Sequence, residues 1–404
     1  MNYIKTNNKE VKESNFQTFA VFSIAVYIVI TAIFETSTTL NSGYSSYAIY
    51  FCLGVCAFNL IRKNVIRVNL YSAVLIMLMG VFALSSYFSP ASELYKDMYL
   101  YRFITSAILV ILVLNTISSF KEINVILNSV VVAGTALAIV MYAQYGFSNL
   151  ADAVERLDNA MGNQNQIGLY CAFGIIFAFY LLLSNLHTWR VFYYIGCIII
   201  STPAVMFTAS RKAIIVIAAA LLVLFVFYFN SKNVIKKLFA FLFVLLIIYF
   251  IIDRVPAFSV IRERFVQMFE LFAGKDTDNI GDENRVNFLN VSMEYFFKAP
   301  VFGNGFCYSY HLFGTYTHNN FTELLLNNGL VGFILHYIPK IRVLFDGFKL
   351  LKKNRKIATL ILVIAVSLFV SDIGVITYYN RFLMIVLALA VKAVDFCKAE
   401  ESDN

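Results

Sequence analysis

The chain has 404 residues, of which 60% are hydrophobic and only 14% are charged. Soluble domains average roughly 45–50% apolar and about 25% charged residues, so this composition excludes a soluble globular enzyme and predicts a polytopic membrane protein. The formal net charge is +8, but its distribution matters more than its sum, because the positions of lysine and arginine orient membrane helices.

Apolar runs recur along the whole chain. A membrane-spanning helix needs about 20 mostly apolar residues, and the sequence offers about twelve such runs. They predict an all-α polytopic integral membrane protein with a single transmembrane domain over residues 1–404, whose first run acts as the first span. The predicted spans are 16–34, 44–60, 68–88, 98–117, 123–145, 167–185, 191–209, 213–229, 238–252, 320–339, 357–377 and 382–397.

Basic residues predict the orientation of these spans. Short loops that face the cytoplasm carry an excess of lysine and arginine, and the loops alternate consistently if both termini are cytoplasmic. The chain is therefore expected in the cytoplasmic (inner) membrane. The basic residues on the cytoplasmic side are Lys5, Lys9, Lys12, Arg62, Lys63, Arg67, Lys121, Arg190, Lys232, Lys236, Lys237, Lys349, Lys352, Lys353, Arg355, Lys356 and Lys398.

The largest polar feature is an extracytoplasmic loop over 253–317, which precedes the tenth span. Apolar and aromatic residues recur at helical spacing within it and stop before Pro300. They predict an amphipathic helix near 283–297 on the outer membrane surface. The six cysteines show no metal-ligand or disulfide spacing, and the chain holds no P-loop and no dinucleotide fingerprint, so no cofactor and no metal are expected.

The polar stretch around His318 is the strongest candidate for chemistry, because polar groups at membrane depth usually mark function. Thr317 is predicted to cap the tenth span, which places His318 and Asn319 in its first turn. The histidine is then either a polar interfacial cap or a general base. Glu323 follows on one helix face that descends into the bilayer, and it is expected to pair with an outer arginine. Asn327 continues that face.

Two outer arginines are candidates for binding an anion. Arg211 lies in the tight hairpin between two predicted spans, and Arg285 opens the amphipathic helix. A guanidinium grips phosphate through paired hydrogen bonds, whereas the neighbouring Lys212 is expected to snorkel. Asn163 and Asn165 belong to a row of amides that either binds sugar hydroxyls or forms an ordinary turn and helix cap.

The spacing His318-Asn319, nine residues, Gly329, two residues, Gly332 resembles the signature of the bacterial O-antigen ligase and polysaccharide polymerase family. The surroundings agree over about residues 145–340. The supporting features are Ser210-Arg211, the Asn-rich helix entrance, the long outer loop with Arg285, and Gly303-Asn-Gly305.

This resemblance implies a glycosyltransferase with a lipid-linked donor. His318 would be the catalytic base that activates an acceptor hydroxyl, and the reaction would invert the anomeric carbon without a metal. Donor and acceptor would be glycans on undecaprenyl diphosphate, at a site that faces outward. A chain-length regulator and the lipid bilayer are the further partners implied, and nucleic acid is not expected. The substrate-binding residues would be Arg211, Arg285, Asn319, Glu323, Asn163 and Asn165.

Alternative functions remain open at this point. The stretch from Tyr145 to Gly168, together with Thr317 to Glu323, looks more like polymerases of O-antigen or capsule than like ligases that transfer glycan to lipid A–core. A lipid-glycan transporter or flippase would need charges along a central path, and mid-span charges are scarce apart from Asp372. A structural assembly factor would not need its outer arginines.

Overall fold

The computed structural model describes residues 15–34, 43–151, 163–186, 188–229, 239, 241–242, 246, 249–250, 252–273 and 280–402. Across these residues the regular structure is helical and no strand occurs, which confirms the predicted all-α class. The predicted span at 238–252 and the basic residues that precede Asn15 fall mostly or wholly outside the described residues.

Eight helices in the described part of the chain are long and apolar enough to cross a membrane. The protein is therefore a multi-pass membrane protein, while the count of twelve spans stays a prediction. The eight are α1 (Asn15–Phe34), α2 (Gly43–Lys63), α3 (Leu70–Phe88), α4 (Glu93–Thr116), α5 (Phe120–Tyr145), α7 (Gln164–Ser184), α8 (Arg190–Phe207) and α14 (Asn320–Leu350). The other predicted runs appear as α9 (Arg211–Phe227), α15 (Arg355–Asp372) and α16 (Arg381–Ser402).

Polar side chains start several of these helices by accepting from free backbone N–H groups. Asn69 accepts from the Ser72 amide and forms a capping box at the start of α3. Ser119 accepts from the Glu122 amide at the start of α5. Asn163 accepts from the Asn165 amide at the start of α7. The row of amides that begins at Asn163 therefore caps a helix, which was one of its two expected roles.

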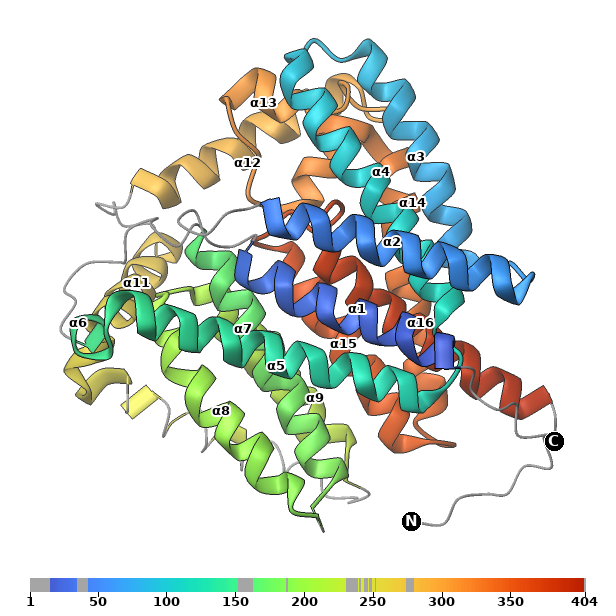
Figure 1. Ribbon diagram of the computed structural model, residues 1–404. Helices are drawn as coiled ribbons and strands as arrows, with labels where there is room; N and C mark the ends of the chain where they lie inside the picture. Colours follow the sequence, from blue (N-terminus) through green and yellow to red (C-terminus); the bar gives the residue numbers. More distant parts are fainter. Residues whose placement is uncertain are drawn as a thin grey trace.

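The most deeply buried helix is α7, which packs against α5, α8 and α9 (Figure 1). Small residues let α5 and α7 approach closely. A Cβ added at Gly134 would lie 2.9 Å from the Tyr170 carbonyl oxygen and 3.2 Å from the Gly174 Cα. The start of α7, which carries Asn163, is thereby fixed within the bundle.

A buried polar network joins four helices at one end of the bundle. Gln17 donates to the Thr116 carbonyl oxygen at 2.6 Å and to Glu122 Oε1 at 2.8 Å. Asn59 donates to Gln17 Oε1 at 3.0 Å. The network joins α1, α2, α4 and α5 at the starts of α1 and α5.

Four helices outside the candidate spans gather at the other end of the bundle. Figure 1 shows α6 (Phe147–Ala151), α11 (Ser259–Phe272), α12 (Ile280–Lys298) and α13 (Tyr308–Phe313) away from both chain termini. The helix expected near 283–297 corresponds to α12, which is slightly longer in both directions. Its contact with a membrane surface stays a prediction.

Candidate active site

The helix α14 reverses direction at Gly329. Asn320 Nδ2 lies 3.3 Å from His336 Nε2 and 3.1 Å from the Tyr337 hydroxyl oxygen. In a continuous helix, residues this far apart in sequence would be separated by about 25 Å, at a rise of about 1.5 Å per residue. Gly329 has φ 60° and ψ −160°, a conformation open to glycine alone. The expectation of one continuous span over 320–339 is therefore wrong, because 320–328 is a half-helix folded back on 330–350, although Glu323 and Asn327 do share one face of it.

A glycine contact holds this reversal in place. A Cβ on Gly329 would lie 2.5 Å from both the Gly303 nitrogen and the Val301 carbonyl oxygen. The backbone nitrogens of Asn304 and Gly305 donate to the Leu326 and Asn327 carbonyl oxygens at 3.0 and 2.9 Å. The segment 300–305 thus satisfies carbonyls at the end of the half-helix, and the two glycine motifs form one structural unit.

His318 precedes the half-helix rather than forming its first turn. Asn319 is the N-cap, since its Oδ1 accepts from the backbone nitrogens of Phe321 and Thr322 at 3.0 and 3.1 Å. The expected cap at Thr317 is wrong. His318 has φ 62°, which is uncommon outside glycine and recurs at functional sites.

Glu323 anchors the segment that carries His318. Its side chain is almost fully buried, and Oε2 accepts from the Thr317 backbone nitrogen at 2.8 Å. Oε1 accepts from Ser309 Oγ at 2.6 Å and from Asn327 Nδ2 at 2.9 Å. Among the described residues its partners are neutral groups, so the expected pairing with an arginine is wrong. The carboxylate joins the half-helix to α13 and to the residue next to His318.

The surroundings of His318 keep its imidazole neutral. Burial lowers its pKa to about 4, and the positive charges of Lys212 and Arg285 act in the same direction. The ring also lies against Tyr316, with the two centroids 4.3 Å apart. Residues from α9, α12 and the segment before α14 therefore act on one imidazole that can accept a proton at neutral pH.

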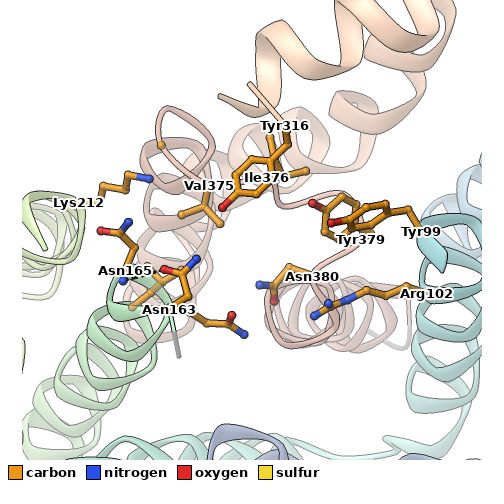
Figure 2. Close-up of a pocket in the computed structure, with 13 residues that line it drawn as sticks. Tyr99, Arg102, Asn163, Asn165, Lys212, Tyr316, Val375, Ile376, Tyr379 and Asn380 are labelled. Atoms are coloured by element: carbon orange, nitrogen blue, oxygen red, sulfur yellow. Dashed lines mark hydrogen bonds between the residues drawn. The ribbon is translucent and has the colours of Figure 1, made fainter. Parts of the chain in front are cut away.

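A polar cavity of about 170 Å³ opens beside this segment. Figure 2 shows Lys212 and Arg102 on opposite sides of it, with both charged groups directed inward. No aspartate or glutamate is among its described lining residues, so the cavity is suited to an anionic ligand. It is lined by Tyr99, Arg102, Asn163, Asn165, Gln166, Leu169, Lys212, Tyr316, Gly374, Val375, Ile376, Tyr379 and Asn380.

Only some of the residues proposed from the sequence as substrate-binding line this cavity. Asn163 and Asn165 line the cavity, whereas Arg211 does not; its Nη1 donates to the Arg264 carbonyl oxygen at 2.9 Å. Lys212, expected to snorkel, lines the cavity instead. Sequence reasoning also passed over Arg102, although an arginine within a predicted span is itself a sign of function.

A buried ion pair holds the loop that forms one wall of the cavity. Lys340 Nζ lies 2.7 Å from Asp372 Oδ2 and 3.1 Å from Thr377 Oγ1. The Thr377 backbone nitrogen donates to Asn320 Oδ1 at 2.8 Å. These contacts tie the loop 373–380 to α15 and to both parts of α14, which gives Asp372 a structural partner.

Comparison of the sequence with known proteins finds a matching family. Residues 195–337 match the family model described as O-antigen ligase. No curated protein matches the chain. The matched residues run from α8 to the middle of α14 and include Lys212, Arg285, His318 and both glycine motifs. Over this region the chain is similar to the O-antigen ligase family, which agrees with the resemblance seen in the sequence.

Proposed function

We propose that the protein is a glycosyltransferase of the cytoplasmic membrane that joins oligosaccharide repeat units into an O-antigen or capsular polysaccharide. Donor and acceptor are glycans carried on undecaprenyl diphosphate, and the reaction takes place on the outer face. Two observations support this proposal: the family match, and a cavity with no carboxylate among its described lining residues, which is lined by Tyr316, the ring neighbour of His318.

In the proposed reaction, an acceptor hydroxyl attacks the anomeric carbon of the donor sugar. His318 takes the hydroxyl proton as the new C–O bond forms, the bond from that carbon to the diphosphate oxygen breaks, and the carrier diphosphate leaves with the electron pair. Arg285 and Lys212 stabilise the charge that grows on the leaving group. Arg211, the residue expected from the family resemblance, supports the start of α9 through its contact with Arg264.

Binding of the donor would also change the pKa of His318. In the free protein, Lys212 and Arg285 help to hold the pKa of His318 near 4. A bound diphosphate offsets those positive charges and raises this pKa, which brings the imidazole closer to the value that suits a general base at neutral pH. His318 is then strongest as a base only when its substrate is present.

The observation that carries this proposal is a largely buried histidine with a positive φ of 62°, whose ring lies against Tyr316 and whose pKa is lowered by burial and by the charges of Lys212 and Arg285. The test is His318→Ala in cells that make the polysaccharide. We expect the variant to accumulate in the membrane like the wild type but to lose glycan chain extension. Lys298→Gln, which removes an exposed cation of α12 that pairs with Glu294, is the matched control and should keep long chains. Long chains in the His318→Ala strain would refute the base assignment.

A ligase is the second candidate, because the matching family model is described as O-antigen ligase. The two reactions leave different products in a deletion strain. A polymerase predicts a single repeat unit attached to the lipid A–core, since transfer continues without extension. A ligase predicts long chains that stay on the carrier lipid.

A further inference from the structure

Arg102 lies inside a candidate membrane span, nine residues after the first residue of α4. At a rise of about 1.5 Å per residue, it stands roughly 13 Å along the helix from that end. An ionisable side chain at such a position usually faces a water-filled cavity and takes part in function. Arg102 does face the cavity, on the wall opposite Lys212 (Figure 2).

The groups around Arg102 differ from those around His318. Its guanidinium carbon lies 5.8 Å from the centroid of the Tyr379 ring, and the rings of Tyr379 and Tyr99 are 5.0 Å apart. Tyr310 donates a hydrogen bond to the Tyr99 hydroxyl and packs against its ring. Asn380 adds an amide to the same wall. One guanidinium, two supported aromatic rings and one amide therefore face a common space.

We propose that Tyr99, Arg102, Tyr379 and Asn380 form a subsite for a carboxylate-bearing sugar of the glycan. A guanidinium binds a carboxylate through two parallel hydrogen bonds. Aromatic rings provide rigid apolar area for the C–H face of a sugar, and an amide can bond to a ring hydroxyl. The inference rests on the proposed function, and it adds that the repeat unit contains an acidic sugar.

A second diphosphate is the competing source of negative charge at Arg102. The aromatic and amide lining favours a sugar, because a diphosphate has no apolar face to place on Tyr99 and Tyr379. The proposed function assigns the leaving diphosphate to Lys212 and Arg285, the two cations that lower the pKa of His318, and Lys212 lies on the wall opposite Arg102. The two sources predict different effects of replacing Arg102.

Binding to the purified full-length protein in detergent distinguishes them, measured by ligand-observed NMR with D-glucuronate, D-glucose and pyrophosphate. We expect Arg102→Gln to raise the dissociation constant of glucuronate by about ten- to one hundred-fold, as for loss of hydrogen bonds to a charged group. Arg102→Lys keeps the charge but not the paired hydrogen-bond geometry, so it should raise the dissociation constant of glucuronate by a smaller factor. Glucose and pyrophosphate binding should change little, while Lys212→Gln should weaken pyrophosphate alone.

Unchanged glucuronate affinity in both Arg102 variants would overturn the proposal. So would a selective loss of pyrophosphate binding in Arg102→Gln, which would assign the subsite to a diphosphate. Chemical analysis of the native glycan gives an independent check, since a repeat unit without any acidic sugar also overturns it. Failure of the proposed function has a separate readout, namely long chains in the His318→Ala strain.

Discussion

Glu323→Gln tests whether the buried carboxylate positions His318. The wild-type carboxylate accepts three hydrogen bonds, two at Oε1 and one at Oε2. A glutamine amide has nearly the same shape but accepts through one oxygen only. If its nitrogen occupies the Oε2 position, it faces the Thr317 backbone N–H as a second donor. If it occupies the Oε1 position, it faces the amide nitrogen of Asn327.

The expected magnitude follows from the loss of one such bond. A hydrogen bond to a charged group contributes about 1.5–3 kcal/mol. If the loss near Thr317 displaces His318 from its working geometry, the barrier rises by that amount, and kcat falls by about ten- to one hundred-fold. The Michaelis constant should change little, because Glu323 is covered by protein and lies away from the cavity lining.

The assay is extension of a lipid-linked repeat unit by purified protein, with rates measured as a function of pH. Ser309→Ala removes one donor to the same carboxylate but leaves the Thr317 contact, so it is the matched control and should lose much less activity. A correctly folded Glu323→Gln protein with a wild-type kcat would refute the positioning role. A higher Michaelis constant at unchanged kcat would instead assign Glu323 to substrate binding.

Three further predictions concern other parts of the site. Gly329→Ala should prevent accumulation of folded protein, as measured by detergent-solubilised yield, because its Cβ would lie 2.5 Å from the backbone of 301–303. Lys212→Gln should raise the pKa of His318, so the acid limb of the kcat/KM profile, where protonation of the base removes activity, should move to higher pH. Lys340→Met should destabilise the protein by about 3–5 kcal/mol, because it leaves Asp372 buried without its partner. The double variant Lys340→Met, Asp372→Leu should recover most of that stability, and thermal unfolding of both variants measures the difference.

The positions of the spans could be predicted from the sequence because each depends on a local run of apolar residues. The reversal in α14 could not, since 320–339 has the length of one membrane span, and the turn-type sequence Asn327-Asn328-Gly329 inside it is interpreted from the sequence as part of a continuous helix. Whether Arg211 or Lys212 faces the cavity depends on the local geometry of the hairpin, where Ala209 has a positive φ of 48°. Composition holds no information about that angle.

The hydrogen-bond partners of Glu323 also could not be predicted from the sequence. Its depth and burial could be anticipated from its position in an apolar run, but its partners come from α13 and from Thr317 on a folded-back chain. A charge at membrane depth suggests an opposite charge as partner, and neutral donors can satisfy a carboxylate equally well. Arg102 was given no role from the sequence because Glu93, Lys96 and Asp97 precede it. A further charge there looked like part of a polar helix end rather than an isolated charge in a span.

The half-helix 320–328 explains in structural terms why nine residues separate Asn319, the neighbour of His318, from Gly329. Nine residues form two and a half turns and span about 13 Å, so they set how far His318 stands from the glycine contact at 303 and 329. One inserted or deleted residue would rotate one end against the other by about 100°. If the change lies between Asn319 and Glu323, it would also carry Glu323 away from Thr317. A change in the length of the half-helix would therefore displace His318 relative to the glycine contact, whereas substitutions that keep the length would not.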